Sequence, residues 1–183
     1  SMVISIVKNR LNHPLMANNI ARSDLDALIE YLSEEDPRLT QGEQVAAFEA
    51  EWSEWLGVKY SVYVNSGSSA NLITLAVLRN QTGLGDLIVP PLTWVSDITA
   101  TLVNGFTPVF VDIDRETFNI DPAGIKQALT QRTRAIIPVH LFGQTADMEP
   151  LWRLAVLHDI PIVEDACQAI LAECDGRRAG TFG

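Results

Sequence analysis

Short, continuously apolar segments alternate with amphipathic stretches through most of this chain. The segments that predict strands are residues 60–64, 87–89, 108–111, 135–139 and 161–163, and those that predict helices are residues 70–79, 94–103, 123–129 and 149–158. Strands that are apolar throughout are buried on both faces, and their alternation with helices indicates a parallel sheet. We therefore expect a three-layer α/β/α fold with a mostly parallel, doubly wound sheet, whose ligands bind beyond the carboxyl ends of the strands.

Two helices are expected ahead of this alternating region, at residues 23–33 and 43–56. Ser23 offers a hydroxyl to cap the first of them. No repeat, low-complexity tract or flexible linker interrupts the rest of the chain. The simplest division is therefore a lead-in at residues 1–21 and one domain at residues 22–183.

The composition narrows the class of partner. Thirteen basic and 23 acidic residues give a net charge of -10, which repels the phosphate backbone of nucleic acids and anionic membranes. The chain has no apolar run long enough to span a bilayer. Its two cysteines, Cys167 and Cys174, have neither disulfide-framework nor metal-ligand spacing. We expect a cytoplasmic protein with no metal site, and neither nucleic acid nor membrane as a partner.

A serine-rich run, Asn65-Ser66-Gly67-Ser68-Ser69-Ala70-Asn71, joins an expected strand to an expected helix. Free backbone N–H groups at a helix start, a small glycine and several hydroxyls together suit a phosphate. The alternative is a serine N-cap with an ordinary turn, and these seven residues leave both open. The run lacks the lysine of a P-loop and the three glycines of a dinucleotide fingerprint.

Three further residues end expected strands at the same edge of the sheet. Asp165 follows residues 161–163 and could hold the protonated nitrogen of a pyridine ring, or could only cap the next turn. Its coexistence with the serine-rich run favours the first function. Trp94 could stack on a flat ring or lie in the core, and His140 could contact a ligand or be a satisfied loop histidine. A ligand site requires the Ala70 helix start and Asp165 to open onto one cavity.

Five ordered segments carry a family resemblance: NSGSSANL, VPPLTWVSDITATLVNGFTPVFVDID, TRAIIPVHLFGQTADME, IVEDACQA and GRRAGTFG. In order and spacing they resemble the DegT/StrS-type nucleotide-sugar aminotransferases, from about Pro14 onward. The resemblance implies the aspartate-aminotransferase-like fold of pyridoxal-phosphate enzymes. Residues 22–183 would then be the cofactor-binding large domain, incomplete.

The resemblance also implies roles for single residues and for partners. The cofactor, pyridoxal 5'-phosphate or pyridoxamine 5'-phosphate, would have its phosphate held by Gly67, Ser68 and Ser69. Trp94 would stack on its ring, Asp165 would pair with the ring nitrogen and Gln168 would contact the ring hydroxyl, while His140 is a weaker substrate candidate. The implied substrates are a nucleotide-linked keto sugar and an amino donor, and the implied assembly is a homodimer. The products would serve cell-surface polysaccharides or secondary metabolites.

The catalytic lysine of the family is not found among the lysines of this chain. Lys8 lies in the lead-in, Lys59 at a strand start and Lys126 in a helix, all poorly placed for a site at the strand ends. In the family, a serine and the Schiff-base lysine follow shortly after the segment that ends here at Gly183. Asp175-Gly176 predicts a hairpin just before that segment. We expect a truncated C-terminus and an inactive fragment, with no catalytic residue in this chain.

Two alternatives remain open. A branch of the family comprises sugar 3-dehydratases, which use pyridoxamine phosphate and a histidine instead of the lysine, and NSGSSANL resembles that branch at least as closely as it resembles the aminotransferases. The deciding position lies beyond Gly183. The other alternative is a half-length protein that binds a phosphorylated ligand or a protein partner without catalysis.

Overall fold

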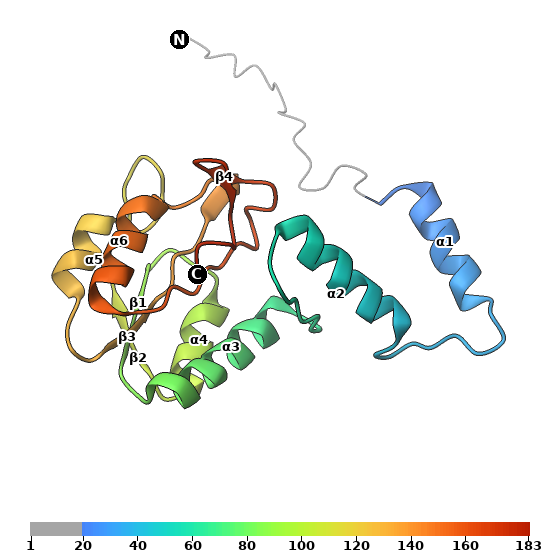
Figure 1. Cartoon of the computed structure of the whole chain (residues 1–183), viewed down its shortest axis with the longest axis horizontal. Helices are drawn as coiled ribbons and strands as arrows, with labels where there is room; N and C mark the ends of the chain where they lie inside the picture. The colour runs from blue at the N-terminus through green and yellow to red at the C-terminus, as the bar shows by residue number, and fades with distance from the viewer. Residues whose placement is uncertain (1–19) are drawn as a thin grey trace, which may run out of the picture. The chain divides into compact units, whose positions relative to one another are not determined.

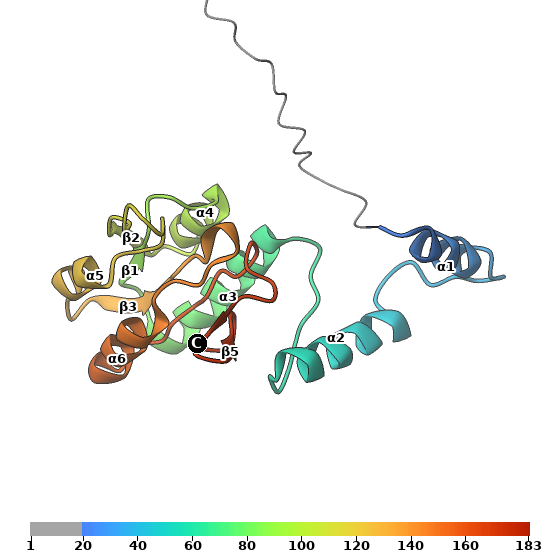
Figure 2. The ribbon, with the colours of Figure 1, turned by 90° about the horizontal axis from the view of Figure 1, so that it is seen from above.

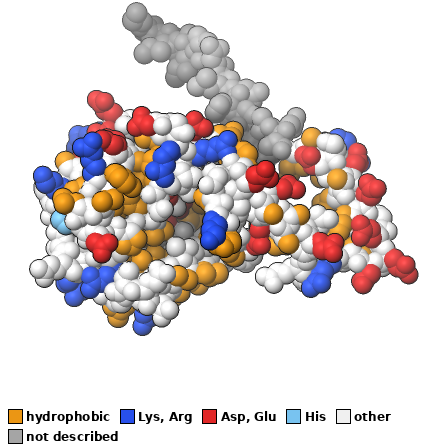
Figure 3. Space-filling view, in the orientation of Figure 1, with side chains coloured by type: hydrophobic (Ala, Val, Ile, Leu, Met, Phe, Trp, Pro, Cys, Tyr) orange, Lys and Arg blue, Asp and Glu red, His pale blue; other side chains and the backbone are white. Residues whose placement is uncertain are grey.

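The computed structural model describes residues 20–183, which belong to two compact units, residues 1–43 and 44–183 (Figure 1). In the first unit, α1 (Arg22–Leu32) is an acidic helix, and acidic side chains gather over it in Figure 3. Its N-cap is Ala21 and not the expected Ser23. The backbone N–H of Ala21 donates to the Asp24 carboxylate at 2.7 Å, so an acid in the first turn closes the helix start.

The second unit opens with α2 (Glu43–Leu56), at the bounds expected from the sequence. None of its residues is buried. Its aromatic side chains pack on one another instead, with the Trp52 and Trp55 rings 4.9 Å apart. The Arg178 guanidinium lies 4.5 Å from the Trp55 ring, so a cation–π contact joins this helix to the end of the chain.

A parallel sheet forms the centre of the second unit. Its strands are β1 (Asp86–Val89), β2 (Thr107–Phe110) and β3 (Thr133–Ile136), in the order β2-β1-β3. Beyond β3, single parallel bridges join Ile162 to Ile136 and Asp165 to Val139. The expected strands at 135–139 and 161–163 are therefore only partly regular, but their chain paths run side by side.

The strand expected at residues 60–64 does not form. Val62 and Tyr60 are 80% and 76% exposed, and the Tyr63 N–H donates to the Glu49 side chain rather than to a strand. The apolar pattern of this segment is typical of a strand, but a strand forms only where it can pair with the edge of a neighbouring strand. The described residues provide none beside this segment.

Helices cover both faces of the sheet, as Figures 1 and 2 show. One face carries α3 (Gly67–Thr82) and α4 (Val95–Val103), and the other carries α5 (Pro122–Ala128) and α6 (Met148–His158). Side chains of β1 alternate between the two cores: Leu87 and Val89 pack with α3 and α4, whereas Ile88 packs with α5 and α6. The three-layer α/β/α fold is confirmed.

A small hairpin is followed by residues 179–183, where the N–H groups of Gly180, Phe182 and Gly183 donate to the Glu164 carboxylate. The hairpin strands β4 (Glu173–Cys174) and β5 (Arg177–Arg178) flank Asp175 and Gly176, which both have positive φ, as the sequence predicted. A short 3-10 helix, η1 (Leu141–Gly143), follows a few residues after β3. No helix between residues 20 and 183 is long and apolar enough to cross a membrane.

Candidate functional site

A cavity of about 280 Å³ lies at the carboxyl ends of the sheet strands. Four segments line it: residues 67–71 at the start of α3, residues 94–96 at the start of α4, residues 139–141 after β3, and residues 165–168. This is the edge where parallel α/β sheets bind ligands. Five of the six residues predicted to bind a cofactor line this cavity: Gly67, Ser68, Trp94, Asp165 and Gln168.

The start of α3, which lines the cavity, presents unpaired donors. The Ser66 hydroxyl accepts from the Ser69 N–H at 3.1 Å, and the Ser66 carbonyl accepts from the Ala70 N–H at 3.0 Å. The N–H groups of Gly67 and Ser68 have no hydrogen-bond partner among residues 20–183. The serine N-cap and an anion-binding site can therefore coexist. The cap occupies only the amides of Ser69 and Ala70, and those of Gly67 and Ser68 stay available to an anion.

Ser69 differs from its predicted role. Its amide is taken by the Ser66 cap, its hydroxyl accepts from the Ser66 hydroxyl at 3.1 Å, and it does not line the cavity. The structure thus brings Gly67 and Ser68 to the site, while Ser69 completes the cap.

Asp165 lines the same cavity and is a buried residue, only 8% exposed. Its backbone is fixed because its N–H donates to the Pro138 carbonyl and its carbonyl accepts from His140, both at 2.9 Å. One carboxylate oxygen accepts from the Cys167 N–H at 3.0 Å, which is the turn-capping role that the sequence left open. The carboxylate both caps that turn and faces the cavity.

Two further predicted residues, Trp94 and Gln168, line the same cavity. Trp94 is the N-cap residue of α4 and is 68% exposed, so it is not the core tryptophan of the alternative interpretation. Its ring is available for stacking on a flat ligand. Gln168 also lines the cavity, and its side-chain oxygen accepts from the Phe142 N–H at 3.2 Å.

Sequence reasoning missed a polar group beneath the cavity. Asp97, on α4, is 2% exposed, accepts from Asn71 Nδ2 at 2.6 Å and also from the Thr93 hydroxyl. Burial, with a smaller contribution from the Asp165 carboxylate and against the lowering effect of the Thr93 hydroxyl, raises the pKa of Asp97 to about 6. The available signal was a lone acid at a core-facing position of an apolar helix.

Cys167 also lines the cavity, beside the same two acids. Burial raises the pKa of its thiol to about 12, and the charges of Asp165 and Asp97 contribute to the increase. Because the thiolate is the nucleophilic form, this shift lowers the reactivity of the Cys167 thiol.

The structure does not bring His140 to the cavity. Its side chain is fully buried, Nδ1 accepts from the Ala146 N–H and Nε2 lies 3.0 Å from a Glu164 oxygen. An Nδ1 acceptor puts the proton on Nε2, which therefore donates to Glu164. With both ring nitrogens engaged, His140 has none left for a ligand. The expected ligand contact is thus corrected to a buried structural pair.

The lysines lie away from the cavity. Lys59 is exposed, with its ammonium 5.1 Å from the Tyr60 ring, and Lys126 is exposed on α5. Lys8 falls outside the described residues. Neither described lysine lines the site.

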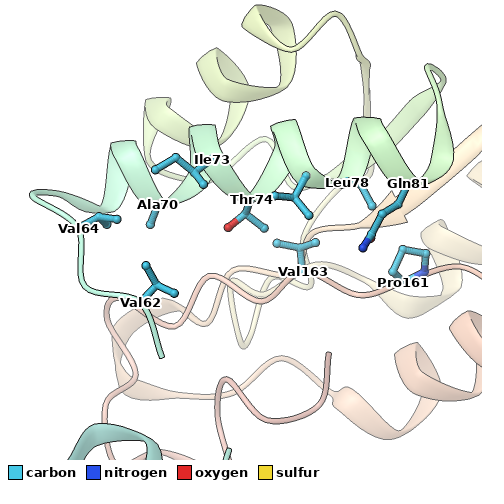
Figure 4. Close-up of a pocket in the computed structure, with 10 residues that line it drawn as sticks. Val62, Val64, Ala70, Ile73, Thr74, Leu78, Gln81, Pro161 and Val163 are labelled. Carbon is cyan, nitrogen blue, oxygen red and sulfur yellow. The ribbon is translucent and has the colours of Figure 1, made fainter. Parts of the chain in front are cut away.

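A second cavity, of about 380 Å³, lies between α3 and residues 161–163 (Figure 4). Its lining is apolar except for Thr74 and Gln81. It contains no charged side chain and no free helix start, so it does not suit an anionic ligand. The cavity beside Asp165 suits a small aromatic phosphate better, since residues with free amide donors and an acidic residue both line it.

Comparison with known proteins gives relatives of two kinds. GDP-4-keto-6-deoxy-D-mannose 3-dehydratase of Yersinia pseudotuberculosis is 35% identical over 181 residues, covering 96% of this chain and 46% of that protein. UDP-N-acetyl-3-dehydro-alpha-D-glucosamine 3-aminotransferase of Acidithiobacillus ferrooxidans is 42% identical over 150 residues, covering 81% and 40% respectively. The chain therefore spans less than half the length of these curated relatives.

Solved structures give the same result. Escherichia coli GDP-4-keto-6-deoxy-D-mannose-3-dehydratase with bound hydrated PLP is 32% identical with a TM-score of 0.87, over 94% of this chain and 45% of that one. NtdA of Bacillus subtilis with bound PMP is 33% identical with a TM-score of 0.78, over 87% and 37% respectively.

The sequence model of one family, described as the DegT/DnrJ/EryC1/StrS aminotransferase family, matches residues 19–183. That match covers nearly all of the chain and agrees with the fold and with the resemblance found in the five sequence segments. The chain belongs to the DegT/DnrJ/EryC1/StrS aminotransferase family.

Proposed function

We propose that this chain is the cofactor-binding part of an aminotransferase that uses pyridoxal 5'-phosphate or pyridoxamine 5'-phosphate and acts on a nucleotide-linked keto sugar. The 3-aminotransferase relative and GDP-perosamine synthase of Caulobacter vibrioides, 38% identical over 143 residues, support this assignment. SpsC of Bacillus subtilis, a spore coat polysaccharide biosynthesis protein 37% identical over 165 residues, supports a role in polysaccharide synthesis.

One observation carries the proposal: residues with free amides and a buried acidic residue line one cavity. In this assignment, the Gly67 and Ser68 amides bind the cofactor phosphate with the positive end of α3. Asp165 accepts from the protonated ring nitrogen, Trp94 covers one ring face and Gln168 contacts the ring hydroxyl. When bound, the cofactor supplies an electron sink for breaking bonds next to its amino nitrogen.

The remaining parts of the function are also proposals. We expect the longer protein to be a cytoplasmic homodimer, whose active sites are completed by the partner subunit and by a lysine absent from this chain. We expect the 183-residue chain alone not to transaminate, because Lys59 and Lys126 lie away from the cavity.

The test uses the full-length gene product with glutamate and a 4-keto nucleotide sugar, and follows the amino sugar by chromatography and mass spectrometry. We expect product from the natural protein and at least a hundredfold less from Asp165→Asn, since the ring nitrogen then loses its charge partner. Asp86→Asn, at the opposite end of the sheet, is the matched control. Absence of amino sugar from the natural protein with all substrates tested would reject the proposal.

A 3-dehydratase of the same family is the second candidate. The observation that favours it is the higher TM-score of the dehydratase structure, 0.87 over 94% of this chain, against 0.78 over 87% for NtdA. The same assay separates the two activities, because a dehydratase yields a 3-deoxy sugar without nitrogen. A non-catalytic ligand-binding protein would yield neither product.

A further inference from the structure

A buried polar network, centred on Glu164, lies next to residues that line the cavity. The Glu164 side chain is 3% exposed, and the His140 side chain is fully buried. The Oε2 atom of Glu164 accepts from His140 Nε2 at 3.0 Å and from the Gly180 N–H at 2.7 Å. Its Oε1 atom accepts from the N–H groups of Phe182 at 2.6 Å and Gly183 at 2.8 Å. Each carboxylate oxygen therefore has two donors, and the network joins three segments that are far apart in sequence.

His140 holds two consecutive residues of the neighbouring segment. Its backbone N–H donates to the Asp165 carbonyl at 2.9 Å, and its ring donates to the Glu164 carboxylate. The ring itself is fixed because Nδ1 accepts from the Ala146 N–H at 3.0 Å. Neither His140 nor Glu164 lines the cavity, but Asp165, directly after Glu164, does. The network therefore acts on the backbone that carries the cofactor-binding acid.

The side chains of Glu164 and Asp165 leave an extended segment on opposite sides. A rotation of the peptide between them turns both side chains, so a contact that fixes one also restrains the other. We infer that Glu164 is a positioning residue of the cofactor site: held by His140 and by residues 180–183, it fixes the direction of the Asp165 carboxylate at the cavity. This inference rests on the proposed function. Glu164 acts through Asp165 and touches no ligand itself.

Glu164→Gln keeps the size of the side chain but breaks the match between donors and acceptors. The amide oxygen serves one pair of donors, and the NH₂ group then faces the N–H groups of the other pair. His140 cannot adapt by moving its proton to Nδ1, because Nδ1 accepts from the Ala146 N–H. Glu164→Asp keeps both acceptor oxygens but is one methylene shorter, and it serves as a milder second variant.

The first measurement needs no cofactor and uses the full-length gene product. Hydrogen exchange, read by mass spectrometry with fragmentation of the peptides, reports the amides of Gly180, Phe182 and Gly183. We expect Glu164→Gln to speed their exchange at least about tenfold, because they lose their acceptor. Glu149→Gln, at an exposed pair with Arg153, is the control and should leave these amides unchanged. Unchanged exchange in Glu164→Gln would overturn the inference.

The second measurement is a double-mutant cycle on the dissociation constant of pyridoxamine phosphate, obtained by equilibrium dialysis. The cycle compares the natural protein, Glu164→Gln, Asp165→Asn and the double variant. If Glu164 acts through Asp165, its loss matters only while the Asp165 carboxylate is present. We expect Glu164→Gln to raise the dissociation constant about tenfold in the natural background and less than about twofold in the Asp165→Asn background.

A purely structural role gives a different result in the same cycle. A general disturbance of the site would raise the dissociation constant by the same factor in both backgrounds and would overturn the inference. No change in the natural background would overturn it as well. If Glu164→Gln does not fold, Glu164→Asp carries the same cycle and is judged by the same criterion.

These outcomes also separate the inference from the proposed function. If pyridoxamine phosphate binds the natural protein and Asp165→Asn weakens it, but Glu164→Gln costs an equal factor in both backgrounds, the proposed function stands and only the inference fails. If the natural protein binds no pyridoxamine phosphate, the proposed function fails and the inference fails with it.

Discussion

Glu164 and Asp165 are neighbours in sequence, yet their carboxylates have different partners. Successive side chains of an extended segment point to opposite sides. Asp165 faces the cavity, whereas Glu164, with a side chain only 3% exposed, accepts from His140 and from the N–H groups of Gly180, Phe182 and Gly183. Burial raises the pKa of Glu164, but these hydrogen bonds outweigh it, so that its pKa lies below the ordinary 4.5.

We predict that Glu164→Gln lowers the free energy of unfolding by about 2 to 3 kcal/mol, because the amide NH₂ would face backbone donors. A group with a lowered folded-state pKa stabilises the fold above its ordinary pKa, 4.5, and this stabilisation disappears as pH falls through the lowered value. Urea unfolding at pH 7 and pH 3 should therefore show a smaller difference between variant and natural chain at pH 3. Glu149→Gln, at an exposed pair with Arg153, is the control and should change little.

The glycine at the start of α3 gives a second prediction at the scale of one residue. A Cβ at Gly67 would lie 3.6 Å from the Cys167 sulfur, an ordinary contact, so Gly67→Ala should fold with nearly unchanged stability. The added methyl lies at the amide that would approach the phosphate. We predict a dissociation constant for pyridoxamine phosphate at least about tenfold higher, or 1.4 kcal/mol. Asn80→Ala, on the exposed side of the same helix, should bind normally.

At the scale of elements, the residue directly before β1 is Gly85, and any larger residue there would clash with the backbone. A Cβ at Gly85 would lie 2.2 Å from the Arg132 carbonyl oxygen, which accepts from the Asp86 N–H at 2.9 Å at the point where β1 meets β3. Strand pairing and side-chain volume therefore compete directly there.

We predict that Gly85→Ala destabilises the chain by about 2 to 3 kcal/mol, since backbone must move to accept the methyl group. Gly67→Ala is the matched glycine control, because it introduces the same methyl group without a backbone clash. Denaturant midpoints measured in parallel test the contrast. Equal midpoints would show that the entry to β1 relaxes freely.

The elements also show which sequence signals were sufficient. Helix periodicity gave α2 at its observed bounds, and Asp175-Gly176 gave the β4–β5 hairpin. These signals are local, because each depends on residues within one or two turns. The segment at residues 60–64 has an equally clear strand pattern but remains unpaired, since pairing depends on a neighbouring strand.

At the scale of the whole molecule, the family match covers residues 19–183, while the curated relatives extend over more than twice the matched length. The cavity is built within this chain from four separate segments. A lysine able to bond to a cofactor in that cavity is not among the described residues.

We predict that borohydride reduction of the 183-residue chain with pyridoxal phosphate leaves no site-specific adduct on Lys59 or Lys126. Both are exposed, and neither lines the cavity. Peptide mass spectrometry measures the adduct at each lysine, with a denatured sample as the reference for nonspecific labelling. Stoichiometric labelling of one lysine in the folded chain alone would show that the cofactor site has been misassigned.

The sequence by itself determined the layer architecture, most of the helices, the hairpin and five of the six residues at the cavity. These follow from periodicity and from residues at the ends of strands, whose positions converge in any parallel sheet. Only the tertiary structure decided that His140 is sealed against Glu164, that Ser69 belongs to the cap and that Asp97 is buried and accepts from Asn71 and Thr93. Those contacts join segments that are far apart in sequence or depend on which way a side chain turns, and neither periodicity nor spacing records that.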